Sequence, residues 1–419
     1  MSGLGGLRGT GDFGTSERPE SFREMILRLN PNGTAPIFAL TSKARKKTVS
    51  DPHFHWWNEA NVLVRLQVNG AHASGDTVIN INSADPTAST LDVNFGNATH
   101  LKPGDLIMVE PTADAAAFAP EFMQVTGALS DTQFTARRGQ AGTTPGALSN
   151  GQFLLLIGSA YAEGGLAPRA VTRNPVKFDN FTQIFKDAYE ISGTVDATTF
   201  RTGDPWSEDK KRKMFDHSRG IELAFLFGQK NETATSAENG KPIRFMAGLR
   251  QSIPQSRQFV FTAPVKLGTD ATNSFLDKVY KVFDYDSPAG DTRLAFAGNQ
   301  AINALAKVAA ATTNVRLNSD SIIKQYGMEF REFIMPQGRL LIKSHPLMNI
   351  HGGIYAKSMF ILDFASIQYV CLKGRDTKVR DNVQTQEEDV RRGYVMTECS
   401  LALDRGGLTC AYLGNIIDV

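Results

Sequence analysis

The chain of 419 residues has no long apolar run, and no window approaches the roughly 18 uninterrupted apolar residues of a transmembrane helix. Its N-terminus also lacks the apolar core of a signal peptide. These absences predict a protein that is made in the cytoplasm and has no membrane partner. They also disfavour a secreted or surface β-protein.

Cysteine is scarce as well. The three cysteines, Cys371, Cys399 and Cys410, show no CxxC spacing and lie in apolar, strand-like surroundings. An odd number without metal-ligand spacing favours buried free thiols over disulfides or a zinc site.

The motifs of common enzymes are absent. The sequence contains no Gly-x-Ser-x-Gly elbow, no His-Glu-x-x-His, no Walker loop and no Asp-x-Asp-x-Asp calcium loop, and its seven histidines are scattered. We therefore predict no catalytic residues, no cofactor and no enzyme activity, with an unrecognised soluble enzyme as a remaining alternative.

One pair of histidines has the spacing of metal ligands on a strand. His53 and His55 alternate in the segment DPHFHWWNEA, but no carboxylate or third histidine lies nearby in the sequence at ligand spacing. Packing of the neighbouring Trp56 and Trp57 is the favoured interpretation, and we predict no metal site.

Charge is nearly balanced overall but unevenly distributed. The formal net charge is +2, whereas residues 60–166 contain nine acids and four bases, which gives this segment −5 and the remainder +7. An acidic block inside a basic chain suggests separate domains that face different surroundings.

A long helix is predicted from Ser207 to Gly228. Ser207 is expected to cap it and Gly228 to end it, while Met214, Ser218, Ile221 and Phe225 recur at helical spacing and predict the buried face. The first turns are basic, and their cations are Lys210, Lys211, Arg212 and Lys213.

Residues 62–166 show six short strand patterns separated by turn signals, which predict a small β-barrel or β-sandwich. The segment 171–195 then alternates polar and apolar residues. We interpret it as an extended arm whose partner strand precedes the β insert.

The chain begins with a glycine-rich segment, followed by an extended arm with a basic cluster. Most short charge runs are solvated surfaces, which is the favoured interpretation here, and contact with phosphates or an acidic neighbour is the alternative. The cations of this cluster are Lys43, Arg45, Lys46 and Lys47.

The order of these elements resembles the major capsid proteins of tailed bacteriophages, whose Johnson fold is shared with herpesvirus capsid proteins and encapsulins. The likeness is strongest in HWWNEANVL before the insert, in NFTQIFKDAYEISGT after it, in the long helix, and in EFIMPQGRLLI and ECSLALDRGGLTCAYLGNI near the C-terminus. It covers nearly the whole chain as a pattern of elements.

The resemblance implies an α+β fold with five parts. These are an N-terminal arm (1–52), an extended loop (53–61 and 167–200), the inserted β domain (62–166), a peripheral domain with the long spine helix and terminal strands (201–260 and 326–419), and an axial domain core (261–325). No charged helical pro-region is visible and no cross-linking residues can be matched, so neither feature is expected.

The resemblance also implies a function: a shell subunit that assembles into hexamers and pentamers, encloses double-stranded DNA without sequence preference and resides in the virion after assembly in the host cytoplasm. Scaffolding, portal and decoration proteins are further candidate partners. An encapsulin, the shell of a cellular compartment, is the alternative within the same fold.

The arms of such a subunit should contact its neighbours, because they have little core of their own. Candidate inter-subunit contacts are Phe178, Phe181, Ile184, Phe185, Trp56 and Trp57. The two basic clusters are expected on the inner face or between subunits, and the acidic insert on the outer face, since it would be repelled by packaged phosphates.

Overall fold

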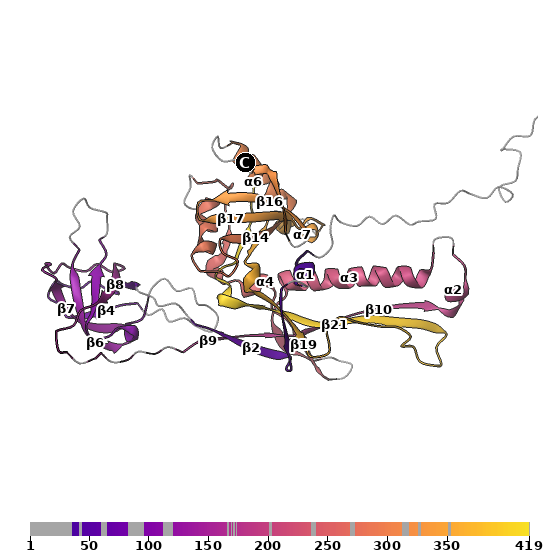
Figure 1. The fold of residues 1–419 in the computed structure, drawn as a ribbon, viewed down its shortest axis with the longest axis horizontal. Coiled ribbons are helices and arrows are strands. Elements are labelled where there is room, and N and C mark those ends of the chain that lie inside the picture. Colours follow the sequence, from indigo (N-terminus) through magenta and orange to yellow (C-terminus); the bar gives the residue numbers. More distant parts are fainter. Residues whose placement is uncertain are drawn as a thin grey trace, which may run out of the picture.

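The computed structural model describes residues 36–418 except 42–43, 60–64, 83–95, 112–119, 166, 169, 171, 173, 201–202, 236–239, 269–272, 312–317, 326–327 and 351–352. Figure 1 shows three regions: a β insert at one end, a long sheet with a helix along it in the middle, and a second, larger sheet above. None of the described helices is long and apolar enough to cross a membrane. The glycine-rich start and Lys43 lie outside the described residues.

The spine helix is α3, Pro205–Phe227, and it begins two residues before the predicted start. The Asp204 carboxylate accepts hydrogen bonds from the backbone N–H groups of Trp206 and Ser207, each at 3.2 Å. Asp204 is therefore the N-terminal cap, and the prediction of Ser207 was wrong. Proline is well suited to the first helical position, so the helix begins at Pro205 and the residue before it is the cap.

The predicted end of this helix is confirmed, since Gly228 is its C-terminal cap. A Cβ atom at Gly228 would lie 2.7 Å from the carbonyl oxygen of Met246, so the close approach of residues 246–248 requires glycine here. The mid-helix Gly220, in contrast, faces open space.

The buried face of α3 differs from the prediction in its first half. Ile221 and Phe225 are buried as expected, but Met214 is 43% exposed and Ser218 is half-buried, and the buried residue of that turn is His217. Figure 1 shows that the C-terminal half of α3 lies nearest the larger sheet, whereas its first half lies only along the strands of the middle sheet. Burial accordingly increases toward Phe227.

The middle sheet has five strands in the order β1-β19-β21-β10, with β20 also on β21. The antiparallel pair β10–β21 is continuous over ten residue pairs, from Gln183–Cys399 to Ser192–Val390, and β1 pairs in parallel with β19. The strands are β1 (Arg45–Val49), β10 (Gln183–Ser192), β19 (Ile367–Leu372), β20 (Lys378–Arg380) and β21 (Val390–Leu403).

One face of β10 is covered by α3 and the other is open. Phe185, Tyr189 and Ile191 alternate with exposed residues, among them Ile184, which is 49% exposed. This alternation is typical of a strand with one solvated face.

The larger sheet has seven strands in the order β13-β22-β18-β14-β17-β16-β15. Its strands separate two cores: on β14, Leu294 and Phe296 pack in the core shared with α3, while Ala295 and Ala297 pack in a second core with α6. The strands are β13 (Gln258–Val260), β14 (Thr292–Ala297), β15 (Asn318–Gln325), β16 (Met328–Met335), β17 (Gly338–Ser344), β18 (Met359–Leu362) and β22 (Ala411–Gly414).

This sheet crosses the expected boundary between the axial and peripheral domains at residues 325 and 326. β16, β17, β18 and β22 come after that boundary, yet they lie in the same sheet as β14. Strand pairing between distant segments overrides a division by position along the chain. The segment 167–200, expected to belong to the extended loop, is also divided. Its strand β10 pairs along its whole length with β21 in the middle sheet.

The remaining elements are short, apart from α6. The two-stranded sheet β2–β9 joins the middle sheet to the insert, and β11–β12 follows α3. These remaining elements are α1 (Pro36–Thr41), β2 (His53–Asn58), β9 (Val176–Phe181), α2 (Gly193–Ala197), β11 (Asn231–Thr235), β12 (Pro242–Phe245), α4 (Leu249–Ser252), η3 (Gln255–Arg257), α5 (Leu276–Val279), η4 (Tyr280–Phe283), α6 (Asn299–Ala311), α7 (Pro346–Ile350), α8 (Gly353–Ala356), η5 (Phe364–Ser366) and η6 (Asp404–Gly407).

The β insert has six strands in the order β3-β8-β5-β6-β7-β4 and a hydrophobic core made only of its own residues. Its first strand pairs with its last, so its two ends are close together, as expected. Its elements are β3 (Arg65–Gln67), β4 (Val78–Asn80), η2 (Ala98–His100), β5 (Asp105–Val109), β6 (Phe122–Ser130), β7 (Gln133–Gln140) and β8 (Phe153–Ser159).

One buried ion pair fixes the inside of the insert. The side chains of Glu121 and Arg138 are 6% and 4% exposed, and the two groups meet through two hydrogen bonds, one of them 2.6 Å from Nη2 to Oε2. Burial opposes ionisation of the carboxyl group, but the hydrogen bonds from Arg138 and from the backbone outweigh it and lower the pKa of Glu121.

We predict that Arg138→Met lowers the free energy of unfolding of the insert by about 3 kcal/mol at neutral pH, because it leaves the Glu121 charge buried without its partner. Hydrogen exchange of residues 122–159 in the full chain should accelerate, while exchange in α3 stays unchanged. Arg137→Met is the matched control, since Arg137 is exposed on the same strand.

The wild-type pair should also give a pH dependence. A lowered pKa in the folded state means that the stabilisation is present above the carboxyl group's unfolded pKa and is lost as the pH falls through the folded value. Equal exchange rates in the two arginine variants would contradict this role of the pair.

Candidate assembly surfaces

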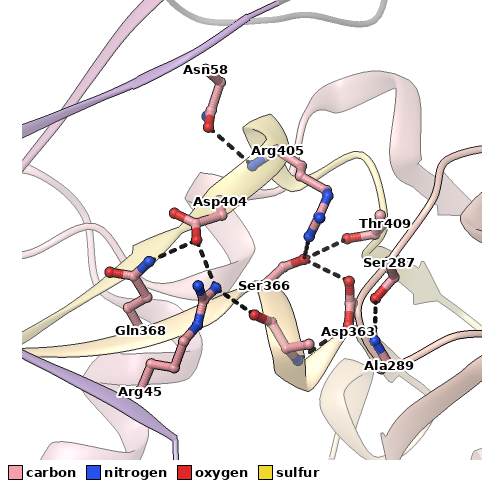
Figure 2. A network of polar contacts seen from close by, with 11 residues as sticks. Arg45, Asn58, Ser287, Ala289, Asp363, Ser366, Gln368, Asp404, Arg405 and Thr409 are labelled. Atoms are coloured by element: carbon pink, nitrogen blue, oxygen red, sulfur yellow. Dashed lines mark hydrogen bonds and ion pairs between the residues drawn. The ribbon is translucent and has the colours of Figure 1, made fainter.

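A polar network holds the end of β2 nearest the insert, and strand β1, onto the turn η6 at Asp404–Gly407 (Figure 2). The Arg45 guanidinium donates to the Ala365 carbonyl at 2.6 Å and to Asp404 Oδ2 at 2.9 Å, and Gln368 donates to the same Asp404 oxygen at 2.7 Å. The backbone N–H of Arg405 donates to Asn58, the last residue of β2. Segments distant in sequence are thus fixed at one point.

A buried carboxylate in the last turns of the spine helix performs a similar task. Glu222 on α3 is fully buried and accepts hydrogen bonds from the backbone N–H groups of Ile37 at 2.9 Å and Phe38 at 2.6 Å. His345, also fully buried, lies 2.7 Å from it through Nε2. This group attaches α1 and the turn before α7 to the spine helix.

A second histidine joins the spine helix to the middle sheet. His217 contacts Asp187 Oδ2 on β10 at 2.7 Å through Nδ1 and Thr397 Oγ1 on β21 at 2.8 Å through Nε2. Sequence reasoning identified neither His217 nor Glu222 as a contact. The sequence did contain a signal for such contacts: His217 and Glu222 are polar residues on the face of the helix that is otherwise buried and apolar.

The hairpin β2–β9 has two different faces, because opposite residues of an antiparallel pair share a face. On one face, Phe54 is buried against Val370 and Ala402 of the middle sheet, and the Trp56 ring stacks on Phe178 with centroids 6.0 Å apart. On the opposite face, Trp57 is 60% exposed. The hairpin therefore packs one face on its own chain and leaves the other face open except at Phe181.

The six aromatic and aliphatic candidates consequently divide into two groups. Phe181 is buried, and Phe178, Phe185 and Trp56 are partly buried, all within their own chain. Trp57 and Ile184 are the two with large exposed area. Only these two offer an open apolar surface to a neighbour.

Most of the basic candidates are neutralised within the chain. Lys210 donates to Asp381 at 2.6 Å and lowers the pKa of that carboxyl group, and Lys46 pairs with Asp376, so both basic clusters contact the segment 376–381. Among the described residues, Lys47 and Lys213 make no ion pair. The other paired cations are Arg45 with Asp404, Lys211 with Glu208 and Arg212 with Asp209.

A family model described as "SU10 major capsid protein" matches residues 7–410, nearly the whole of the chain. The chain belongs to this family. The major capsid protein of Pseudomonas phage PaMx41 is 24% identical over 379 residues, which cover 88% of this chain and 84% of that protein.

Several solved structures match this chain at low sequence identity. The capsid of an empty GTA particle matches with a TM-score of 0.45 and 10% identity, covering 97% of both chains. A structure from Microbacterium phage Oxtober96 matches with a TM-score of 0.43 and 11% identity, covering 96% of this chain and 97% of that one. The holo-SrpI encapsulin complex of Synechococcus elongatus PCC 7942 matches 59% of this chain and 77% of that one, with a TM-score of 0.41 and 12% identity.

Family membership confirms the resemblance seen in the sequence. This SU10-family protein is the major capsid protein of a tailed phage, with the Johnson fold, and it is a subunit of the icosahedral shell of the virion.

We predict that Glu222→Ala destabilises the subunit by about 3 kcal/mol, because two backbone N–H groups and His345 lose their buried partner. Urea unfolding should show the loss, and hydrogen exchange should accelerate first in α1. Asp216→Asn on the same helix is the control: Asp216 forms a surface pair with Arg219 at 3.2 Å and should change stability by less than about 1 kcal/mol. If the two variants unfold alike, Glu222 does not anchor α1.

Proposed function

We propose that the subunit assembles into hexamers and pentamers around double-stranded DNA, without catalysing a reaction, and that assembly takes place in the host cytoplasm. The observation that carries this proposal is the hairpin β2–β9, which extends from the middle sheet toward the insert with one face packed and one face open. Membership in a capsid family supplies the context.

An open apolar surface of this kind favours a protein partner. Trp57 on the hairpin and Ile184 on the uncovered face of β10 are both exposed in the single chain. Burying such groups at a subunit contact contributes about 1.5 to 3 kcal/mol per side chain, and a shell repeats each contact many times. We assign both residues to contacts with neighbouring subunits, and Phe178, Phe181, Phe185 and Trp56 to support of these surfaces from within.

The charge distribution supports an orientation. The insert segment 60–166 carries −5 and the rest of the chain +7, so the insert is better suited to the outer face and the basic remainder to the DNA side. Of the basic candidates, Lys47 and Lys213 are the strongest for phosphate contact, because the paired cations have less charge to offer. Such contacts would be independent of base sequence.

We predict that Trp57→Ala and Ile184→Ala reduce the yield of closed shells severalfold while the thermal stability of the free subunit changes little, since the removed area is exposed in the single chain. Electron microscopy and sedimentation measure assembly, and calorimetry measures stability. Leu129→Ala is the control, because Leu129 is equally exposed, at 60%, but lies on the insert. Normal shells from both variants would refute the assignment.

Phe185→Ala should behave in the opposite way. Phe185 packs against the core shared by α3 and the two sheets, with its ring 6.4 Å from that of His217. Its truncation should lower the stability of the subunit itself, by about 3 kcal/mol. Ile184 is its neighbour on the opposite face of β10. Comparing the two alanine variants separates an effect on folding of the subunit from an effect on assembly of the shell.

We further predict that a peptide tag inserted between Ala141 and Gly142 is bound by its antibody on intact, DNA-filled particles. This turn on the insert has exposed residues with φ of 56° and 75°, and it tolerates extension. Binding only after the particles are opened would place the insert inside. Nucleic acid rather than protein in native particles distinguishes a genome shell from an encapsulin.

A further inference from the structure

Strand pairing brings a carboxylate to the His-x-His pair of β2. In the register of β2–β9, His55 lies opposite Asp179 and His53 opposite Phe181, so the two histidines and the aspartate share the open face of the hairpin. One donor atom from each of the three residues lies within 4.8 Å of the other two.

Within the described part of the chain, the contacts of this cluster leave one buried imidazole nitrogen without a partner, while the other donor atoms contact one another or Lys230. His53 Nε2 lies 2.7 Å from Asp179 Oδ2, and Lys230 Nζ lies 2.9 Å from Asp179 Oδ1. His55 Nδ1 is buried with no hydrogen-bond partner among the described residues. The side chains of His53 and Asp179 are 40% and 33% exposed, so an ion can reach them from solvent.

Two imidazoles and one carboxylate form a donor set that suits a borderline transition-metal ion and not magnesium or calcium, which prefer oxygen ligands. We propose that His53, His55 and Asp179 form a zinc site, with water completing the tetrahedron. His53 and His55 lie on β2 and Asp179 on β9, so the ion links the two strands of the hairpin.

The neighbouring ammonium group gives this site a specific signature. Lys230 neutralises Asp179 when no ion is present, and a divalent cation at the other carboxylate oxygen would be repelled by it. Lys230 thus competes with the ion. This inference does not depend on how the shell assembles, because all three ligands belong to one chain.

The test is calorimetric titration of the full-length chain with zinc chloride. We expect one zinc ion per chain, an affinity at least about tenfold lower in His55→Ala and in Asp179→Asn, and an affinity about fivefold higher in Lys230→Met. His100→Ala is the control for general loss of a histidine, and magnesium chloride is the control for non-specific attraction of cations.

A second measurement separates binding from any change in folding. Zinc should slow hydrogen exchange in residues 53–58 and 176–181 of the wild-type chain and leave exchange there unchanged in Asp179→Asn, whose side chain has the same shape. If no zinc binds, or if zinc binds equally well to the His55→Ala and Asp179→Asn variants, the proposal is wrong and the cluster is an ordinary ion network held by Lys230.

Discussion

The pairing of β10 with β21 is the contact on which the rest of the subunit depends. It joins segments about 200 residues apart, and it forms the surface on which the spine helix lies. His217 contacts both strands, so the helix position and the strand register are specified together. A one-residue slip would move Phe185, Tyr189 and Ile191 to the solvated face and expose the core.

Once this sheet is in place, buried polar groups attach the outlying segments. Glu222 attaches α1, and the turn at Asp404–Gly407 attaches β1 and the insert end of β2. These contacts are directional, unlike apolar packing, and each leaves an unsatisfied group if it is broken. A subunit with long arms therefore gains defined arm positions without a large core beneath each arm.

Local signals in the sequence predicted the elements that are themselves local. The spine helix, the six strands of the insert and the partnership of the two segments flanking it follow from periodicity and turn residues. The errors came from competition between neighbouring signals, as at Ser207, where Asp204 followed by Pro205 makes the stronger start. Sheet membership follows another rule, because one sheet collects strands from residues 258 to 414, on both sides of the expected boundary.

The side-chain clusters were beyond sequence reasoning because their members are far apart. Asp179 lies 126 residues after His53, and Glu222 lies 185 residues after Ile37, so no spacing rule connects them. The insert itself creates the first of these separations. Since its own ends meet at the pair β3–β8, it returns the chain to the hairpin and leaves the register of β2–β9 intact.

The open face of the hairpin combines two demands that usually conflict. A shell contact needs exposed apolar area such as Trp57, whereas a free subunit needs a two-stranded arm that does not collapse or pair wrongly before assembly. Charged and imidazole groups beside Trp57, namely Lys177, His55 and Asp179, keep this face solvated while the aromatic stack of Trp56 and Phe178 holds the other face. The arm can therefore remain extended in solution while Trp57 stays exposed, as the proposed contact with a neighbouring subunit requires.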